Sequence, residues 1–146
     1  MPLAGDYQFS SYEPARRQAE RILSAGTTDG ETVMDRPLVL LVTRGARSGD
    51  LRPIPLMRVE HDGRYAVVAS MGGARRNPAW YRNVVAEPQV ELVDGAVRRD
   101  YRAREVSGAE RAEWWDRAVT AFPPYAEYQA ATQRTIPVFV LEQEGE

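Results

Sequence analysis

Leu38–Ser70 reads LVLLVTRGARSGDLRPIPLMRVEHDGRYAVVAS, in which apolar runs alternate with polar turns rich in glycine. Each apolar run predicts a β-strand, and the three strands are expected at 38–42, 52–60 and 65–70. The middle strand contains Pro53 and Pro55, which donate no backbone hydrogen bonds. That strand must therefore have an open edge or a ligand beside it. Short strands joined by tight turns favour an antiparallel barrel that is closed or partly closed.

The sequence on either side predicts the remaining elements. Two more strands are expected at 89–93 and 97–105 around a turn at Asp94 and Gly95, and a last strand at 136–141. Helices are expected at 12–25, 77–85, 107–120 and 124–132. Their predicted N-terminal caps are Ser10 or Ser11, Asn77, and a capping box of Ser107 with Glu110.

These elements define the predicted fold class as mainly β with α. We expect a split antiparallel β-barrel of about six strands with flanking helices, in one domain overall. Residues 1–34 would form a loose start, an N-terminal helix and a polar connection. Residues 35–146 would form the barrel.

Composition excludes several classes of site. The chain has 146 residues, no cysteine and a single histidine, so thiol chemistry and metal sites built from several histidines or from cysteines are excluded. No apolar run approaches the roughly 20 residues of a membrane span. The first residues lack the basic start and apolar core of a secretory signal. We expect a cytoplasmic protein without an integral membrane segment, and peripheral contact with a membrane stays open.

All 19 basic residues are arginine, and they are unevenly distributed. Residues 44–82 contain eight arginines against Asp50, Glu60 and Asp62, a local balance of +5 in a chain of net charge −2. A basic segment within an acidic protein indicates a local anion site. It argues against nucleic acid as a partner, because that function needs a broad basic face.

Three segments combine residues that could bind a ligand. Gly45–Gly49, with Arg47, Ser48 and Arg52, offers exposed amides and cationic side chains to a phosphate, or is an ordinary hairpin with solvated arginines. Ser70–Asn83 joins a glycine turn to the start of a helix, on which Trp80 and Asn83 share one face. That face could lie beside a flat ligand; the alternative is that Trp80 belongs to the core. Tyr125 and Tyr128 lie one helical turn apart. Two interpretations follow: both hydroxyls border one cavity, or both rings pack over the end of the barrel.

Taken together, these segments resemble the deazaflavin-dependent nitroreductase family, whose members use coenzyme F(420). The family's G-R-K-S-G turn and R-x-x-P-L strand appear at 45–49 and 52–56. Its glycine loop before N-P-x-W-Y-x-N appears at 70–83, and its P-x-Y-x-x-Y and I-P-V pieces appear at 123–128 and 136–138. The resemblance implies a split barrel related to flavin-mononucleotide-binding barrels.

The resemblance also implies a reductase that transfers hydride from reduced F(420) to enones, quinones or nitroaromatics. The cofactor's phosphate and polyglutamate tail would meet Arg47, Ser48 and Arg52. The side chains expected around the deazaflavin ring are Pro53, Ile54, Pro55, Leu56, Met57, Val68, Ala69, Ser70, Met71, Trp80, Tyr81, Asn83 and Tyr125. Solvent, Ser70 or a tyrosine, Tyr125 or Tyr128, would supply the proton.

The chain departs from the family pattern at two positions. Ala46 replaces an arginine, so one tail contact is lost or passes to Arg44, Arg75 or Arg76. Phe122 stands where some nitroimidazole-reducing members have a tyrosine. Two other functions stay open from the sequence: an oxidoreductase that binds flavin mononucleotide (FMN), and a non-catalytic barrel that binds a cofactor or lipid. A homodimer also stays open as the assembly, because barrels of this type often complete a site across two subunits.

Overall fold

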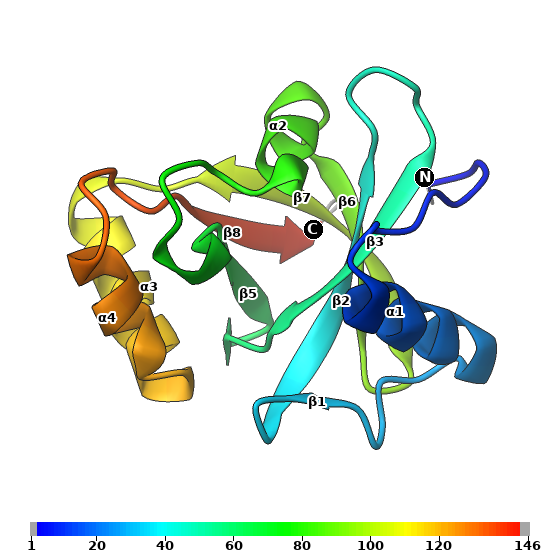
Figure 1. Cartoon of the computed structure of the whole chain (residues 1–146), viewed down its shortest axis with the longest axis horizontal. Helices are drawn as coiled ribbons and strands as arrows, with labels where there is room; N and C mark the ends of the chain where they lie inside the picture. Colours follow the sequence, from blue (N-terminus) through cyan, green and yellow to red (C-terminus); the bar gives the residue numbers. More distant parts are fainter. Residues whose placement is uncertain (1–2, 144–146) are drawn as a thin grey trace.

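A computed structural model describes residues 3–143, and it contains one curled antiparallel sheet (Figure 1). Six strands are long and two have only two residues each. The long strands are β2 (Arg36–Arg44), β3 (Leu51–Met57), β5 (Arg64–Val68), β6 (Gln89–Asp94), β7 (Val97–Glu105) and β8 (Val138–Gln143). The short ones are β1 (Thr32–Val33) and β4 (Glu60–His61). The predicted fold class of a split barrel with about six main strands is confirmed.

The strand order leaves the barrel open along one line. Neighbouring strands follow the order β1-β2-β6-β7-β8-β5-β4, and β3 pairs with β2. No ladder within residues 3–143 joins β3 to β5, although the chain passes from one to the other through β4. We call the line between β3 and β5, across which these two strands do not pair with each other, the seam.

Three hydrophobic clusters explain the apolar runs. Along β2, Val39 and Leu41 face the inside of the barrel, whereas Leu38, Leu40 and Val42 face outward. Both faces of β2 are buried, which is why its sequence is apolar without alternation. A third cluster covers the outer face of β5 and β8 and centres on Trp114.

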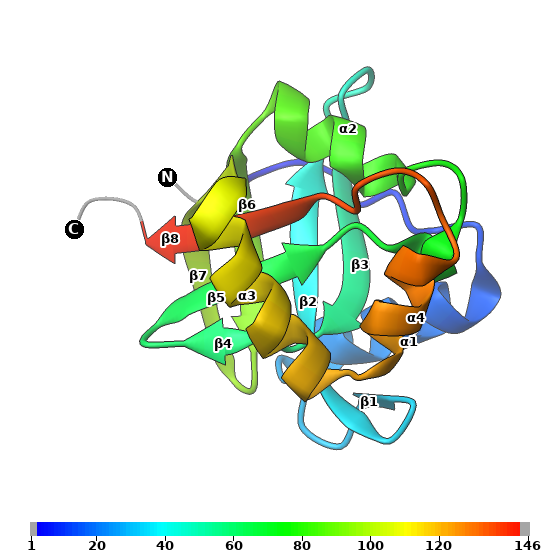
Figure 2. The ribbon, with the colours of Figure 1, turned by 90° about the vertical axis from the view of Figure 1, so that its left-hand side faces the viewer.

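The helices cover the two outer faces and one end of the barrel (Figures 1 and 2). α1 (Glu13–Ala25) packs on β2 and β3 through Ala19 and Ile22. α3 (Gly108–Ala121) and α4 (Pro124–Ala130) lie over the opposite side, and α2 (Ala79–Ala86) packs beside β2. A short 3-10 turn, η1 (Met71–Gly73), contacts α4. No helix within residues 3–143 is long and apolar enough to cross a membrane.

The predicted N-cap residue is wrong at α1 and α2, whereas at α3 it is confirmed without the predicted capping hydrogen bonds. α1 begins after Tyr12, so neither Ser10 nor Ser11 occupies the cap position, although the Ser10 hydroxyl accepts a hydrogen bond from the Tyr12 amide at 3.1 Å. α2 is preceded by Pro78 instead of Asn77. Ser107 does precede α3, but its side chain makes no capping hydrogen bond. Glu110 accepts hydrogen bonds from Arg104 at 2.7 and 2.8 Å, which removes the second half of the capping box.

The N-terminal segment is also more ordered than the sequence predicts. Met1 and Pro2 lie outside the described residues, but the following residues run along the edge of β3. The Leu51 amide donates to the Asp6 carbonyl at 2.8 Å, and the Gln8 amide donates to the Leu51 carbonyl at 2.7 Å. The Tyr7 hydroxyl accepts a hydrogen bond from Arg98. An edge strand offers unpaired backbone groups, and this segment satisfies those of Leu51.

Candidate functional site

The seam presents an edge of β3 that has few donors. Leu40 pairs with Pro55 and Val42 pairs with Pro53, in register with the hairpin that joins β2 to β3. Because the Gly45 amide bonds to the Asp50 carbonyl, alternation along the ladder directs the backbone of Pro53 and Pro55 away from β2. The prolines therefore fall where an open edge requires them, as predicted.

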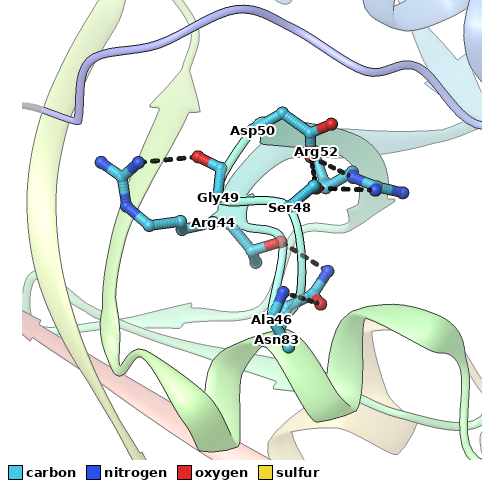
Figure 3. A network of polar contacts seen from close by, with 8 residues as sticks. Arg44, Ala46, Ser48, Gly49, Asp50, Arg52 and Asn83 are labelled. Carbon is cyan, nitrogen blue, oxygen red and sulfur yellow. Dashed lines mark hydrogen bonds and ion pairs between the residues drawn. The ribbon is translucent and has the colours of Figure 1, made fainter.

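The turn between β2 and β3 is held by an internal network (Figure 3). Asp50 accepts hydrogen bonds from the Ser48 hydroxyl at 2.6 Å and from Arg52 Nε at 2.7 Å. These two donors lower the pKa of the Asp50 carboxyl. A Cβ at Gly45 would lie 2.7 Å from the Asp50 carboxylate, so the network needs glycine there. Ser48 and Arg52, both predicted to meet an anion, thus already share a carboxylate.

Helix α2 fixes the same turn from below (Figure 3). The Ala46 amide donates to Asn83 Oδ1 at 3.0 Å, and Asn83 Nδ2 donates to Thr43 Oγ1 at 3.3 Å. Asn83 was predicted to lie beside a flat ligand, and the structure gives it this bridging role. Trp80, on the same helix, is buried against Phe139 with ring centroids 6.0 Å apart.

Four arginines of the basic segment 44–82 have no intramolecular partner among residues 3–143, and all four are exposed. They are Arg47, Arg75, Arg76 and Arg82. The remaining basic residues of the segment are occupied; Arg44, for example, donates to the carbonyls of Gly49 and Ala4. Of the three arginines proposed to compensate for Ala46, only Arg75 and Arg76 are therefore unpaired. The local positive charge is available to an anion beside α2.

The loop after β5 brings Ser70 and Met71 to α4. Met71, Gly72 and Gly73 all have positive φ, at 46°, 64° and 80°. A Cβ at Gly73 would lie 2.7 Å from the Tyr128 carbonyl, so the loop and α4 are in direct backbone contact. Ser70 is only 8% exposed, and its hydroxyl makes no hydrogen bond within the described part of the chain. The side chain of Met71 is exposed.

The two predicted tyrosines of α4 differ in burial. Tyr125 is 5% exposed and packs edge-on against Phe122 at 4.9 Å, whereas Tyr128 is half-buried. Their rings are 6.2 Å apart and nearly perpendicular. Burial, with a smaller contribution from Tyr128, raises the pKa of Tyr125, so its phenol stays protonated. Neither hydroxyl has a hydrogen-bond partner among residues 3–143.

The residues predicted around the ring divide between the two faces of the sheet. Those on the inner face are Ile54, Leu56, Ala69, Trp80 and Tyr81. Met57 and Val68 lie on the face covered by α3 and α4, where they pack in one cluster with Tyr125 of α4. The faces meet at the seam, where β3 and β5 do not pair with each other. Tyr81 also donates to Glu105 at 3.3 Å, which directs its hydroxyl to β7.

Two polar residues of this region were not predicted from the sequence. Asp50 is the carboxylate that holds Ser48 and Arg52, and Arg134 binds the loop that carries Ser70. The sequence could have predicted the role of Asp50, because a carboxylate within a basic turn is expected to pair with a neighbouring arginine. Nothing in the local sequence marks Arg134. No cluster of residues within 3–143 has the side chains to hold a metal ion.

Sequence comparison decides the family of the chain. A family model described as F(420)H(2)-dependent quinone reductase matches residues 14–143. The chain belongs to this family. The F(420)H(2)-dependent quinone reductase Rv1261c of Mycobacterium tuberculosis is 36% identical over 108 residues, which cover 72% of each chain.

Solved structures agree with this assignment. One described as an F(420)-H(2) dependent reductase (FDR-A) is 55% identical, with a TM-score of 0.71 over 77% of this chain and 100% of that one. Another, described as a domain-swapped dimer, is also 55% identical, with a TM-score of 0.73 over 91% of this chain and 100% of that one. The predicted family, an oxidoreductase that uses coenzyme F(420), is confirmed. The roles of individual site residues stay predictions.

Proposed function

We propose that this member of the F(420)H(2)-dependent quinone reductase family reduces a quinone-type acceptor at the seam. The observation that carries the proposal is the arrangement of unpaired polar groups. Exposed arginines beside α2 are free for an anionic tail. The free hydroxyls of Ser70, Tyr125 and Tyr128 lie on a loop and a helix that touch.

The residues fit a cofactor that carries both a planar ring and a polyanionic tail. When bound in its reduced form, F(420) supplies the hydride, and a quinone becomes a hydroquinone by taking that hydride and a proton. Arg47, Arg75 and Arg76 would hold the tail by charge-assisted hydrogen bonds. The seam residues would exclude water from the acceptor. Tyr128, or Ser70 beside it, would donate the proton from its hydroxyl oxygen.

The aromatic cluster has no hydroxyl at position 122, and this bears on the class of acceptor that we propose. Phe122 is buried against Tyr125 and adds no hydroxyl to the site. Quinones, enones and nitroaromatics each take one proton for each hydride, which a single tyrosine can donate, and the family description favours quinones among them. We propose quinones as the preferred acceptors, with enones next and nitroaromatics last. Initial rates with one acceptor of each class, under matched F(420)H(2), test this order, and a higher rate with a nitroaromatic than with a quinone contradicts it.

Cofactor choice gives the direct test of the proposed function. We expect F(420) to bind with micromolar or tighter affinity and FMN to bind more weakly, because one phosphate can engage fewer arginines than a polyanionic tail. Binding should weaken as salt rises, since exposed ion pairs are screened over about 8 Å at physiological ionic strength. Parallel titrations of both cofactors at low and high salt measure this. Equal or tighter binding of FMN would favour the flavin alternative, and cofactor binding without acceptor reduction would favour a non-catalytic barrel.

The network at the β2–β3 turn predicts opposite effects for two neighbouring substitutions. Arg47→Ala should weaken F(420) binding by about threefold to tenfold, because its exposed side chain is screened by solvent. Asp50→Asn should strengthen binding by a similar factor, because it removes the carboxylate that competes for Arg52 and Ser48. Arg52→Ala should cost less than Arg47→Ala, since Arg52 is already paired. Calorimetric affinities beside melting temperatures check the three variants; weaker binding by Asp50→Asn would show that the network shapes the anion site instead of competing with it.

We also propose that the protein is a homodimer. The support is the 55% identical structure described as a domain-swapped dimer. Light scattering coupled to size-exclusion chromatography measures the mass in solution, and a monomer of 16.4 kDa at all concentrations would reject the proposal.

A further inference from the structure

Arg134 lies in the connection between α4 and β8, and its guanidinium binds the loop at 69–77 with four hydrogen bonds. Nε donates to the Ala74 carbonyl at 2.7 Å, and Nη2 donates to the Ser70 carbonyl at 2.7 Å. Nη1 donates to the Ala69 carbonyl at 3.1 Å and to Asn77 Oδ1 at 2.8 Å. The connection before β8 runs beside the loop before α2 in Figure 2.

The loop depends on this side chain because it has left the sheet. β5 ends at Val68, and the Ala69 amide still donates to the Pro137 carbonyl at 2.9 Å. The turn that follows makes only two short-range bonds of its own, Gly73 to Ser70 and Ala74 to Met71. Its three consecutive residues with positive φ include one non-glycine, Met71, a conformation that costs free energy. Within residues 3–143, Arg134 is the one side chain that donates hydrogen bonds to residues 69–77.

Arg134 is itself anchored to the helix that carries the two site tyrosines. Gln129, on α4, donates from Nε2 to the Arg134 carbonyl at 2.8 Å and accepts from the Ile136 amide at 3.0 Å. Arg111 on α3 adds a bond to the Ile136 carbonyl at 2.8 Å. Arg134 therefore connects α4 to the loop. Its backbone carbonyl is bonded to Gln129 of α4, and its guanidinium makes charge-assisted hydrogen bonds to the loop.

We infer that Arg134 is a positioning residue for the acceptor. It holds Ser70 and Met71 at a fixed distance from Tyr125 and Tyr128, so that both walls of the proposed acceptor site form one rigid unit. The expected effect on kinetics rests on the proposed function. The hydrogen bonds by which Arg134 holds the loop are independent of that function. Arginine suits the task because its planar fork reaches acceptors in several directions at once.

Arg134→Lys separates geometry from charge, since lysine keeps the positive charge but loses the fork. In the ligand-free protein, we expect amides within 69–77 to exchange hydrogen at least about tenfold faster, while the β6–β7 hairpin is unchanged. A misplacement of about 1 Å can cost on the order of 100-fold in rate. We therefore expect kcat/KM for a quinone to fall by about 10–100-fold. F(420) affinity should fall by a smaller factor, because Arg75 and Arg76 lie in the same loop whereas Arg47 lies outside it.

Two further variants keep the test decisive. Arg104→Lys is the matched control, because Arg104 also makes several charge-assisted bonds, to Glu110 and Glu142, but lies on β7 outside the site. It should change neither exchange at 69–77 nor kinetics. Asn77→Ala removes one of the four acceptors and should give the same changes on a smaller scale. It carries the test if Arg134→Lys does not fold.

The inference is overturned if Arg134→Lys lowers the melting temperature while exchange at 69–77 and kcat/KM stay at wild-type values. Faster exchange with wild-type kinetics overturns it as well, because the loop would then be held without consequence for the acceptor. A wild-type protein that does not oxidise F(420)H(2) would reject the proposed function instead. In that case the exchange data still decide whether Arg134 holds the loop.

Discussion

Tyr128→Phe should lower kcat for quinone reduction by about 10²–10⁴-fold, the usual contribution of a positioned proton donor. The hydroxyl of Tyr128 has no partner within residues 3–143 and belongs to the half-buried end of the aromatic cluster. Removing it changes no packing, because phenylalanine keeps the ring against Phe122 and Tyr125. F(420) affinity and the melting temperature should therefore stay at wild-type values.

Steady-state kinetics with a quinone and an enone measure this effect. Tyr12→Phe is the matched control, since Tyr12 is an exposed tyrosine at the start of α1 and should behave as wild type. Ser70→Ala in the same assay identifies which hydroxyl donates the proton. Wild-type turnover in Tyr128→Phe, with a large loss in Ser70→Ala, would move the role of proton donor to Ser70.

Tyr125→Ala should lower the free energy of unfolding by about 3–5 kcal/mol, as for other large aromatic residues removed from a core. The ring is 5% exposed and packs edge-on against Phe122 within the cluster that joins α3 and α4 to β5 and β8. The site should fail with the packing, because α4 carries Tyr128 and contacts the loop of Ser70. Both F(420) affinity and turnover are therefore expected to fall.

Tyr125→Phe separates the ring from its hydroxyl. Because that hydroxyl makes no hydrogen bond within the described chain, stability should change little, by less than about 1 kcal/mol. Chemical denaturation of both variants, with kinetics corrected for the folded fraction, measures the two roles. A stable Tyr125→Ala variant with altered turnover would assign the residue to the acceptor instead of the core.

Local sequence was sufficient for the six long strands, but the strand expected at 52–60 divides into β3 (Leu51–Met57) and β4 (Glu60–His61), and β1 (Thr32–Val33) was not expected. The apolar run of β2, the prolines of β3 and the turn at Asp94 and Gly95 each act through backbone conformation or burial over a few residues. Sequence patterns are informative at that range. Local sequence could not separate the predicted ring residues on the inner face of the barrel from those on the face covered by α3 and α4. Both faces of β2 and β5 are buried, so apolar alternation does not reveal which side each residue faces.

Side-chain partners were harder to predict than backbone structure. Asn77 and Glu110 both stood at positions suited to a helix cap, and each is taken by an arginine, Arg134 in one case and Arg104 in the other. A capping bond to one backbone amide competes poorly with a charge-assisted bond to a guanidinium. In a chain whose basic residues are all arginine, caps are easily displaced in this way.

The amino-acid sequence by itself determined the split barrel, the family and the basic segment at 44–82, because these depend on composition and on motifs in order along the chain. Only the tertiary structure decided which four of the eight arginines in that segment are unpaired, that the N-terminal segment pairs with Leu51, and that Arg134 holds the loop of Ser70. An arginine has five donors on a long side chain, so its partners depend on which carboxylates and carbonyls the fold brings within reach, often from residues far away in the sequence.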